Sequence, residues 1–269
     1  MTEDLPAVWE PSKFDGSDLL PVAASGVKSS KGRENIKAED IVLPSLKLLA
    51  GMSDEVTKQT VEGAVPGKFL HTGAQQLFSS PVRAIVCAHT RSRAMFPDPK
   101  NSRYDGLEKC LSRDAVEGSE YGDCDACPHK EWGKDDTTGK SLKPLCGESH
   151  NFTVLTNIGP AVVRMASRAI KSAKNFLTTW NFSSKDLWAH PMVFTTKAVE
   201  DTLPDGRKAT NYVLGMRWDQ ADAVPPPVQQ AAEGIYNIVS NAHEQGNFSS
   251  DEQKFEEAGP DIGDGDIPF

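Results

Sequence analysis

Residues 152–180 read FTVLTNIGPAVVRMASRAIKSAKNFLTTW, and within this stretch the spacing of apolar residues changes from that of strands to that of a helix. Short runs at 152–158 and 161–164 flank Gly159-Pro160, which predicts two strands joined by a tight connection. From Ala166 to Trp180, apolar residues recur every three or four positions, which predicts an amphipathic helix. A second face of this helix carries regularly spaced cations: Arg168, Lys171 and Lys174.

Further strands are predicted on both sides of this stretch, because short β-branched runs are bounded there by Gly and Pro. These runs lie at 66–71, 80–89, 192–200 and 209–218. The last two are joined through 203–206, whose Pro and Gly suit a turn. After the stiff proline stretch 224–227, an apolar stripe at 228–242 predicts a last helix.

This order places one helix between the third and fourth principal strands, which is the outline of a small OB-fold barrel of about five strands. We therefore expect a mainly β, OB-fold-like barrel with one internal helix, a C-terminal helix, a zinc-binding insertion and disordered termini. The expected divisions are a flexible segment 1–38, a barrel domain 39–225 with the insertion at about 105–150, a helix 226–245 and a disordered acidic tail 246–269.

Four of the five cysteines lie in the insertion: Cys110, Cys124, Cys127 and Cys146. The pair Cys124 and Cys127 has the spacing that lets two thiolates reach one ion from a tight turn, and two more would complete a tetrahedral Zn²⁺ site. The insertion is poor in large apolar residues, so metal binding would supply the folding energy that it lacks. We expect one structural zinc per chain.

Other interpretations of the cysteines remain open. His129 or His150 could replace one thiolate as a ligand. The pair could also be a redox dithiol, or the thiols could be unrelated buried groups. Cys87 lies in an apolar run and is interpreted as a core thiol.

The charge is unevenly distributed. The chain has a net charge of -9, but residues 246–269 alone carry seven acids and one lysine. Residues 81–104 have five bases and one acid, and residues 164–217 have nine bases and four acids. An acidic tail on a body with basic segments is the arrangement expected of a polyanion-binding protein, although acidic tails also simply confer solubility.

Membrane insertion and catalysis are not indicated. No run approaches the roughly 18 apolar residues that a membrane span needs, and the acidic start Met1-Thr2-Glu3-Asp4 is unlike a secretory signal, so we expect a cytoplasmic protein. Residues 133–141 resemble a phosphate-binding loop only superficially, because the glycine spacing is wrong and no strand precedes them. We expect a protein that is not an enzyme.

The chain ends in Asp266-Ile267-Pro268-Phe269 after a polar, acidic run. This ending resembles the tail of bacterial single-stranded-DNA-binding proteins, which recruits replication and repair proteins. The resemblance implies that these four residues bind partner proteins such as a polymerase, helicase, nuclease or primase. An apolar Phe269 side chain beside a carboxylate requires a partner pocket that is apolar and rimmed by Arg or Lys.

The body resembles a group of bacteriophage single-stranded-DNA-binding proteins, through segments such as 43–49 and 63–69 and through its length. The resemblance spans roughly 41–218 and implies an OB-fold, sequence-tolerant binding of single-stranded DNA (ssDNA) and a role in phage DNA replication, recombination and repair. The compartment would then be the bacterial host cytoplasm.

Single strands require cations along the backbone path and aromatic faces on which bases stack. The candidate cations are Arg91, Arg93, Lys100, Arg103, Arg164, Arg168, Lys171, Lys174, Lys197 and Arg217. The candidate stacking residues are Phe96, Tyr104, Trp132, Phe152, Tyr212 and Trp218, each of which could instead pack in the protein interior. Two other functions stay open: a zinc-containing adaptor that binds only proteins of the transcription or recombination machinery, and a nuclease or strand-annealing protein.

Overall fold

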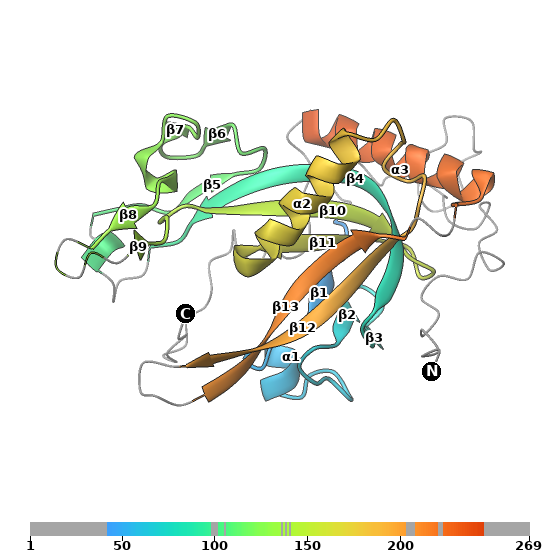
Figure 1. Cartoon of the computed structure of the whole chain (residues 1–269), viewed down its shortest axis with the longest axis horizontal. Helices are drawn as coiled ribbons and strands as arrows, with labels where there is room; N and C mark the ends of the chain where they lie inside the picture. The colour runs from blue at the N-terminus through green and yellow to red at the C-terminus, as the bar shows by residue number, and fades with distance from the viewer. Residues whose placement is uncertain are drawn as a thin grey trace.

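The computed structural model describes residues 42–97, 102–104, 106–135, 137, 139, 141–202, 208–219 and 223–244 (Figure 1). The expected flexible segment 1–38, the turn 203–206, the tail 246–269 and Lys100 lie outside these described residues.

An antiparallel sheet forms the centre of the molecule, in the strand order β11-β10-β4-β12-β13. The strands are β4 (Val82–Met95), β10 (Gly147–Leu155), β11 (Pro160–Ala166), β12 (Met192–Thr202) and β13 (Lys208–Trp218). The long strand β4 pairs with β10 between Ile85 and Ala94, but with β12 only from Val82 to Ala84. The β12–β13 hairpin therefore diverges from β10 and β11 (Figure 1).

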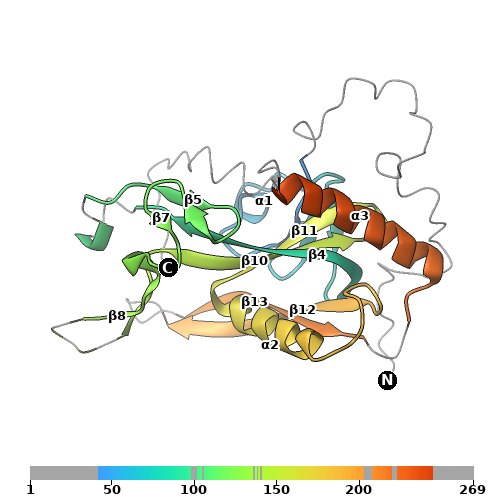
Figure 2. The same cartoon turned by 90° about the horizontal axis from the view of Figure 1, so that it is seen from above.

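Two helices cover opposite faces of this sheet (Figure 2). Helix α2 (Ile170–Asn181) packs with the β12–β13 hairpin on one face, and α3 (Pro226–Glu244) packs on the other. From Ala84 to Cys87, successive residues of β4 alternate between the two interfaces, since Val86 belongs to the core under α2 and Ile85 to the core under α3. Burial on both faces explains why residues 82–88 are an almost continuous apolar run.

A small three-stranded sheet precedes the main one. It consists of β1 (Leu46–Leu48), β2 (Phe69–His71) and β3 (Gln76–Phe78), with the short helix α1 (Asp54–Thr57) between β1 and β2. A parallel bridge between Ser45 and Val162 connects it to β11.

The insertion between β4 and β10 lies at one end of the sheet (Figure 1). Its strands are β5 (Cys110–Ser112), β6 (Glu117–Gly118), β7 (Gly122–Asp123), β8 (Gly133–Lys134) and β9 (Ser141–Leu142). Its 3₁₀ turns are η3 (Ser102–Tyr104) and η4 (Pro128–Lys130). Only β5 joins the main sheet, by pairing with the end of β4.

The expected mainly β fold with a long internal helix and a C-terminal helix is confirmed. The short helix α1 is an internal helix that was not expected, and there are three further differences. The described strands form no closed barrel, because β11 and β13 end the strand order without pairing with each other. The insertion ends before 150, since β10 already begins at Gly147. Helix α2 begins at Ile170, not Ala166, because Ser167 has a φ of 50° and belongs to a preceding 3₁₀ turn, η5 (Ser167–Ala169).

Candidate nucleic-acid interface

Glu148 of β10 lies among cations contributed by β4 and α2, with His150 of its own strand nearby. Its carboxylate accepts a hydrogen bond from Lys174 of α2, with 2.8 Å between Nζ and Oε2. Arg91 of β4 approaches to 3.8 Å between Nη1 and Oε1, and Nε2 of His150 lies 3.8 Å from the same oxygen. Arg93 is the cross-strand partner of Glu148 and lies close enough to act on its charge. Strand register and the position of α2 therefore bring together residues that are distant in sequence.

This group is more basic than acidic. Burial tends to raise the pKa of Glu148, but Lys174, His150 and Arg93 hold it below its usual value, so the carboxyl group is ionised at neutral pH. One carboxylate thus faces two guanidinium groups and one ammonium group. The Lys174 and Arg91 side chains are 54% and 50% exposed, whereas that of Glu148 is only 14% exposed. The cations are consequently accessible to a ligand while the acid is recessed.

Two stacked histidines lie behind the cations. Nε2 of His89 and Nδ1 of His150 are 2.9 Å apart, and the rings stack with centroids 5.2 Å apart. Burial, together with the charges of His150 and Arg91, lowers the pKa of His89 to about 4. Burial also lowers the pKa of His150. Both rings are therefore neutral at pH 7, and the positive charge here comes from Arg and Lys.

A second polar group lies beside the first. Arg168 of η5 donates to Asp201 of β12 at 2.7 Å, and Asn211 of β13 donates to the same carboxylate oxygen at 2.6 Å. The hydrogen bond from Arg168 is the main reason that the pKa of Asp201 is lowered, and the charge of Lys143 contributes. Lys143 precedes β10, and its carbonyl oxygen accepts a hydrogen bond from Arg103.

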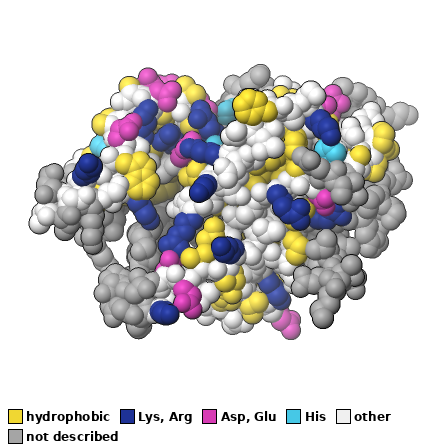
Figure 3. Space-filling model, in the orientation of Figure 1, with side chains coloured by type: hydrophobic (Ala, Val, Ile, Leu, Met, Phe, Trp, Pro, Cys, Tyr) yellow, Lys and Arg dark blue, Asp and Glu magenta, His cyan; other side chains and the backbone are white. Residues whose placement is uncertain are grey.

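We define the basic face as Arg91, Arg93, Arg168 and Lys174 with the acids that they surround. Figure 3 shows Lys and Arg side chains gathered on this side of the molecule, between the insertion and the β12–β13 hairpin. Lys171 is exposed on α2, as the spacing of the helical cations predicted. The fold thus brings four of the ten predicted cations into two adjacent groups.

Other predicted cations lie elsewhere. Phe194 and Leu214 point from the hairpin into the core under α2. Side chains alternate along a strand, and Lys197 and Arg217 each lie three positions further on, so they point away from this core. Arg164 pairs with Asn151, whose neighbour Phe152 faces α2, so Arg164 faces the other side of the sheet.

The predicted stacking residues divide by exposure. Phe152 was wrongly chosen, because its ring is fully buried under α2 and leaves no face for a base. Trp218 packs edge-on against Phe176, with centroids 5.5 Å apart, and the Tyr212 ring lies against Gly67. Tyr104 packs against the small apolar cluster of the insertion, and Lys109 lies over the Phe96 ring. Trp132 is 65% exposed and keeps its ring free for a ligand.

Sequence reasoning missed three residues of this region. Phe182, which directly follows α2, is 85% exposed and is a further stacking candidate. The roles of Glu148 and His89 depend on strand register. The only local signal was polar side chains within strand-like runs.

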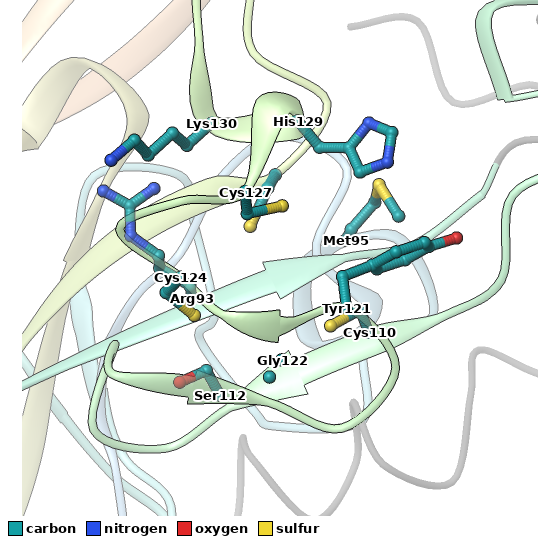
Figure 4. Close-up of a pocket in the computed structure, with 12 residues that line it drawn as sticks. Arg93, Met95, Cys110, Ser112, Tyr121, Gly122, Cys124, Cys127, His129 and Lys130 are labelled. Atoms are coloured by element: carbon teal, nitrogen blue, oxygen red, sulfur yellow. The ribbon is translucent and has the colours of Figure 1, made fainter.

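The four insertion cysteines line one small cavity (Figure 4). Cys110 belongs to β5, Cys124 and Cys127 lie in the turn after β7, and Cys146 directly precedes β10. His129 also lines the cavity, whereas His150 stacks on His89. As the side chains stand, no group of three or more His, Cys, Asp or Glu among the described residues is arranged to hold a metal ion.

Within the described part of the chain, no helix is both long and apolar enough to cross a membrane. Comparison with curated proteins found no match, and comparison with solved structures found none either. A family model described as Pam3 phage gp34-like protein matches residues 15–245. Because this match spans most of the 269 residues, the chain belongs to the Pam3 phage gp34-like protein family.

Proposed function

We propose that the chain is a phage protein that binds ssDNA with little sequence preference and has no catalytic activity of its own. The observation that carries this proposal is the convergence of Arg91 and Arg93 of β4 and Lys174 of α2 on Glu148 of β10. Exposed cations held in a fixed arrangement are what a strand of phosphates requires. Sequence-tolerant binding follows if these cations contact only the backbone.

The strand order supports an OB-fold relationship. Strand β4 pairs with both β10 and β12, and α2 lies between β11 and β12 along the chain. An OB-fold is a five-stranded, partly open Greek-key barrel, and its open face commonly binds oligonucleotides. In this proposal the open side of such a barrel would lie between β11 and β13, which do not pair with each other.

Base stacking would come from exposed aromatic rings outside the basic face. Trp132 in the insertion and Phe182 at the end of α2 are the exposed candidates, at 65% and 85%. Stacking on an aromatic ring contributes about 1–3 kcal/mol per base and does not depend on base identity. The proposed protein would coat and protect single strands during phage replication, recombination and repair.

The tail completes the proposal. Asp266, Ile267, Pro268 and Phe269 lie outside the described residues, and we assign them the recruitment of partner proteins because they resemble the corresponding bacterial tail. The division of labour is then DNA binding by the body and protein binding by the tail.

Titration of the purified chain with fluorescent oligo-dT at several salt concentrations tests the proposal. We expect micromolar or tighter binding that weakens steeply as salt is raised. Absence of such binding would favour a protein-only adaptor. Degradation of a labelled strand that depends on Mg²⁺ would instead indicate a nuclease, and pairing of complementary strands would indicate an annealing protein.

A further inference from the structure

The cavity in the insertion is built from cysteines that are distant in sequence. Figure 4 shows Cys110, Cys124 and Cys127 around one space, with Arg93 on one side and His129 on the other. Cys146 completes the set. The cavity volume is about 10 Å³, which is room for a single small atom or ion and excludes an organic ligand.

Backbone contacts hold the cysteine-bearing segments together. The amide of Cys124 donates to the carbonyl oxygen of Val116 at 2.8 Å, and the amide of Cys146 donates to that of His129 at 2.9 Å. Gly118 leaves the room that the sulfurs occupy, because a Cβ there would lie 2.7 Å from Sγ of Cys110 and 3.8 Å from Sγ of Cys124. Local packing therefore reserves this space for the thiols.

Apolar burial is a weak explanation for this arrangement. The cluster around the cavity has only Met95, Cys110 and Cys146 as buried members, with four partly buried neighbours. All four cysteines are free thiols, and all but Cys127 are buried. The insertion is otherwise built from strands of two or three residues, which stabilise one another little. A group that cross-links the three cysteine-bearing segments would supply the missing stability.

We propose that Cys110, Cys124, Cys127 and Cys146 bind one structural Zn²⁺ as thiolates. Four thiolates fill a tetrahedral shell and leave no position for water, so the ion would stabilise the insertion and not catalyse a reaction. Each thiol that binds gives its proton to the solvent, so zinc uptake releases protons. The four cysteine side chains must change rotamer before their sulfurs can reach one ion. The backbone permits this change, because it already brings all four cysteines to one cavity.

The site would also affect the basic face. Arg93 lines the cavity, and its guanidinium interacts with the thiol of Cys146 by charge and a hydrogen bond. On the neighbouring strand β10, Arg93 is paired with Glu148. A metal that fixes Cys146 would therefore restrict Arg93 on the side where phosphate is proposed to bind. This consequence rests on the proposed function, but the metal site itself does not.

Elemental analysis of the full-length chain tests the site directly. We expect one zinc per chain in the wild type and loss of bound zinc in Cys124→Ser. The matched control is Cys87→Ala, which removes the fifth cysteine, buried under α3, and should retain one zinc. A wild type purified with no metal, or a Cys87→Ala chain that loses as much zinc as Cys124→Ser, would overturn the proposal.

A second measurement avoids relying on a variant that fails to fold. A mercurial reagent should release one zinc from the wild type, and limited proteolysis should then cut between residues 105 and 146 while the rest of the chain stays protected. Restoring Zn²⁺ in the presence of reductant should restore protection. A Cys124–Cys127 disulfide in metal-free protein with an equally protected insertion would contradict the proposal.

Replacement of zinc by Co²⁺ identifies the ligands. Four thiolates predict an intense thiolate-to-metal absorption that is unchanged in His129→Ala. Weaker absorption that changes in His129→Ala would show that the histidine replaces a thiolate, and would overturn the four-cysteine assignment. Because these readouts do not involve DNA, failure of the metal site is distinguishable from failure of the proposed function.

Discussion

The carboxylate of Glu148 lies 2.8 Å from the ammonium group of Lys174, and this contact joins β10 to α2 across 26 positions of sequence. Arg91 and Arg93 approach the same carboxylate from β4. A DNA phosphate would be attracted by the same three cations. Glu148 therefore has two opposing effects: it orients the cations, and its charge repels the proposed ligand.

Replacing Glu148 with Gln should show which effect is larger. We expect the Glu148→Gln chain to bind oligo-dT about two- to fivefold more tightly at low salt, since removing one partly screened charge is worth roughly 0.5–1 kcal/mol. The measurement is fluorescence anisotropy. Glu200→Gln is the control, because Glu200 also pairs with a lysine, Lys208, but at the exposed end of β12. Weaker binding by Glu148→Gln alone would show that orientation of the cations dominates.

The number of phosphate contacts can be counted from salt dependence. For single strands, log K falls with log salt by about 0.7 per contacted phosphate. Lys174→Ala and Arg91→Ala should each weaken oligo-dT binding and make this slope shallower by about 0.7. Lys58→Ala is the matched control, because Lys58 is an exposed lysine of an ion pair beside α1. An unchanged slope in both test variants would remove these residues from the interface.

Local signals were enough to predict much of the fold, but not the site. The helical spacing after residue 166 and the alternating runs at 192–200 and 209–218 each lie within one element, so they identified α2, β12 and β13 closely. The strands of the insertion have two or three residues, which is too short for a recognisable alternation of apolar and polar residues. The order of strands and helices along the chain was visible in the sequence. The lack of barrel closure among the described strands was not, because it depends on which edges pair.

The site depends on contacts between elements. Phe152 and His150 lie on the same face of β10, and sequence alone cannot tell that Phe152 is buried under α2 while His150 stacks on His89. The group around Glu148 requires the register of β4 with β10 and the position of α2. The cysteines are the exception, because their spacing predicted a common location and the fold places them around one cavity.

The stability of the folded chain should fall in mild acid because of the partly buried His89 and the buried His150. The pKa of His89 is about 4 in the folded chain against 6.5 for an unperturbed histidine, so the unfolded chain binds more protons between these values. The contribution of His89 is thus constant above pH 6.5, decreases below it, and is lost by pH 4. We expect the free energy of unfolding in urea to be lower by about 1 kcal/mol at pH 5.5 than at pH 7.5.

The variant His89→Gln should reduce this pH dependence. His150, whose pKa is also lowered, would leave a residual dependence of the same sign. The carboxyl group of Glu148 titrates at lower pH, so it contributes little in this window. An equal loss of stability in wild type and His89→Gln would show that other groups are responsible.

Deletion of Asp266–Phe269 separates the two proposed activities. The shortened chain should bind oligo-dT with equal or higher affinity, because the negative charge of the Asp266 side chain is removed. It should no longer retain host or phage replication proteins in pull-down experiments. An internal deletion of the same length within 246–260 is the control for tail length. A large loss of DNA affinity on deletion of Asp266–Phe269 would contradict the division of labour.

The close contact between Gly67 and the ring of Tyr212 leads to a prediction about how β13 packs against the segment before β2. Gly67 has a φ of 88°, and a Cβ there would lie 2.6 Å from the Tyr212 ring. Gly106 has a similar φ of 72°, but a Cβ there would meet nothing within 4 Å. Both Gly→Ala variants incur the backbone cost of roughly 1 kcal/mol, while only Gly67→Ala adds overpacking of about 1–3 kcal/mol.

Urea unfolding of the two variants therefore isolates the packing contribution. We expect Gly67→Ala to lower the free energy of unfolding by about 2–4 kcal/mol and Gly106→Ala by about 1 kcal/mol. The double variant Gly67→Ala, Tyr212→Ala removes the clash. Its loss of unfolding free energy should therefore be smaller than the sum of the losses in Gly67→Ala alone and Tyr212→Ala alone. Additive losses would mean that the Tyr212 ring moves aside freely, and that it is available for stacking and is not a fixed support of the β12–β13 hairpin.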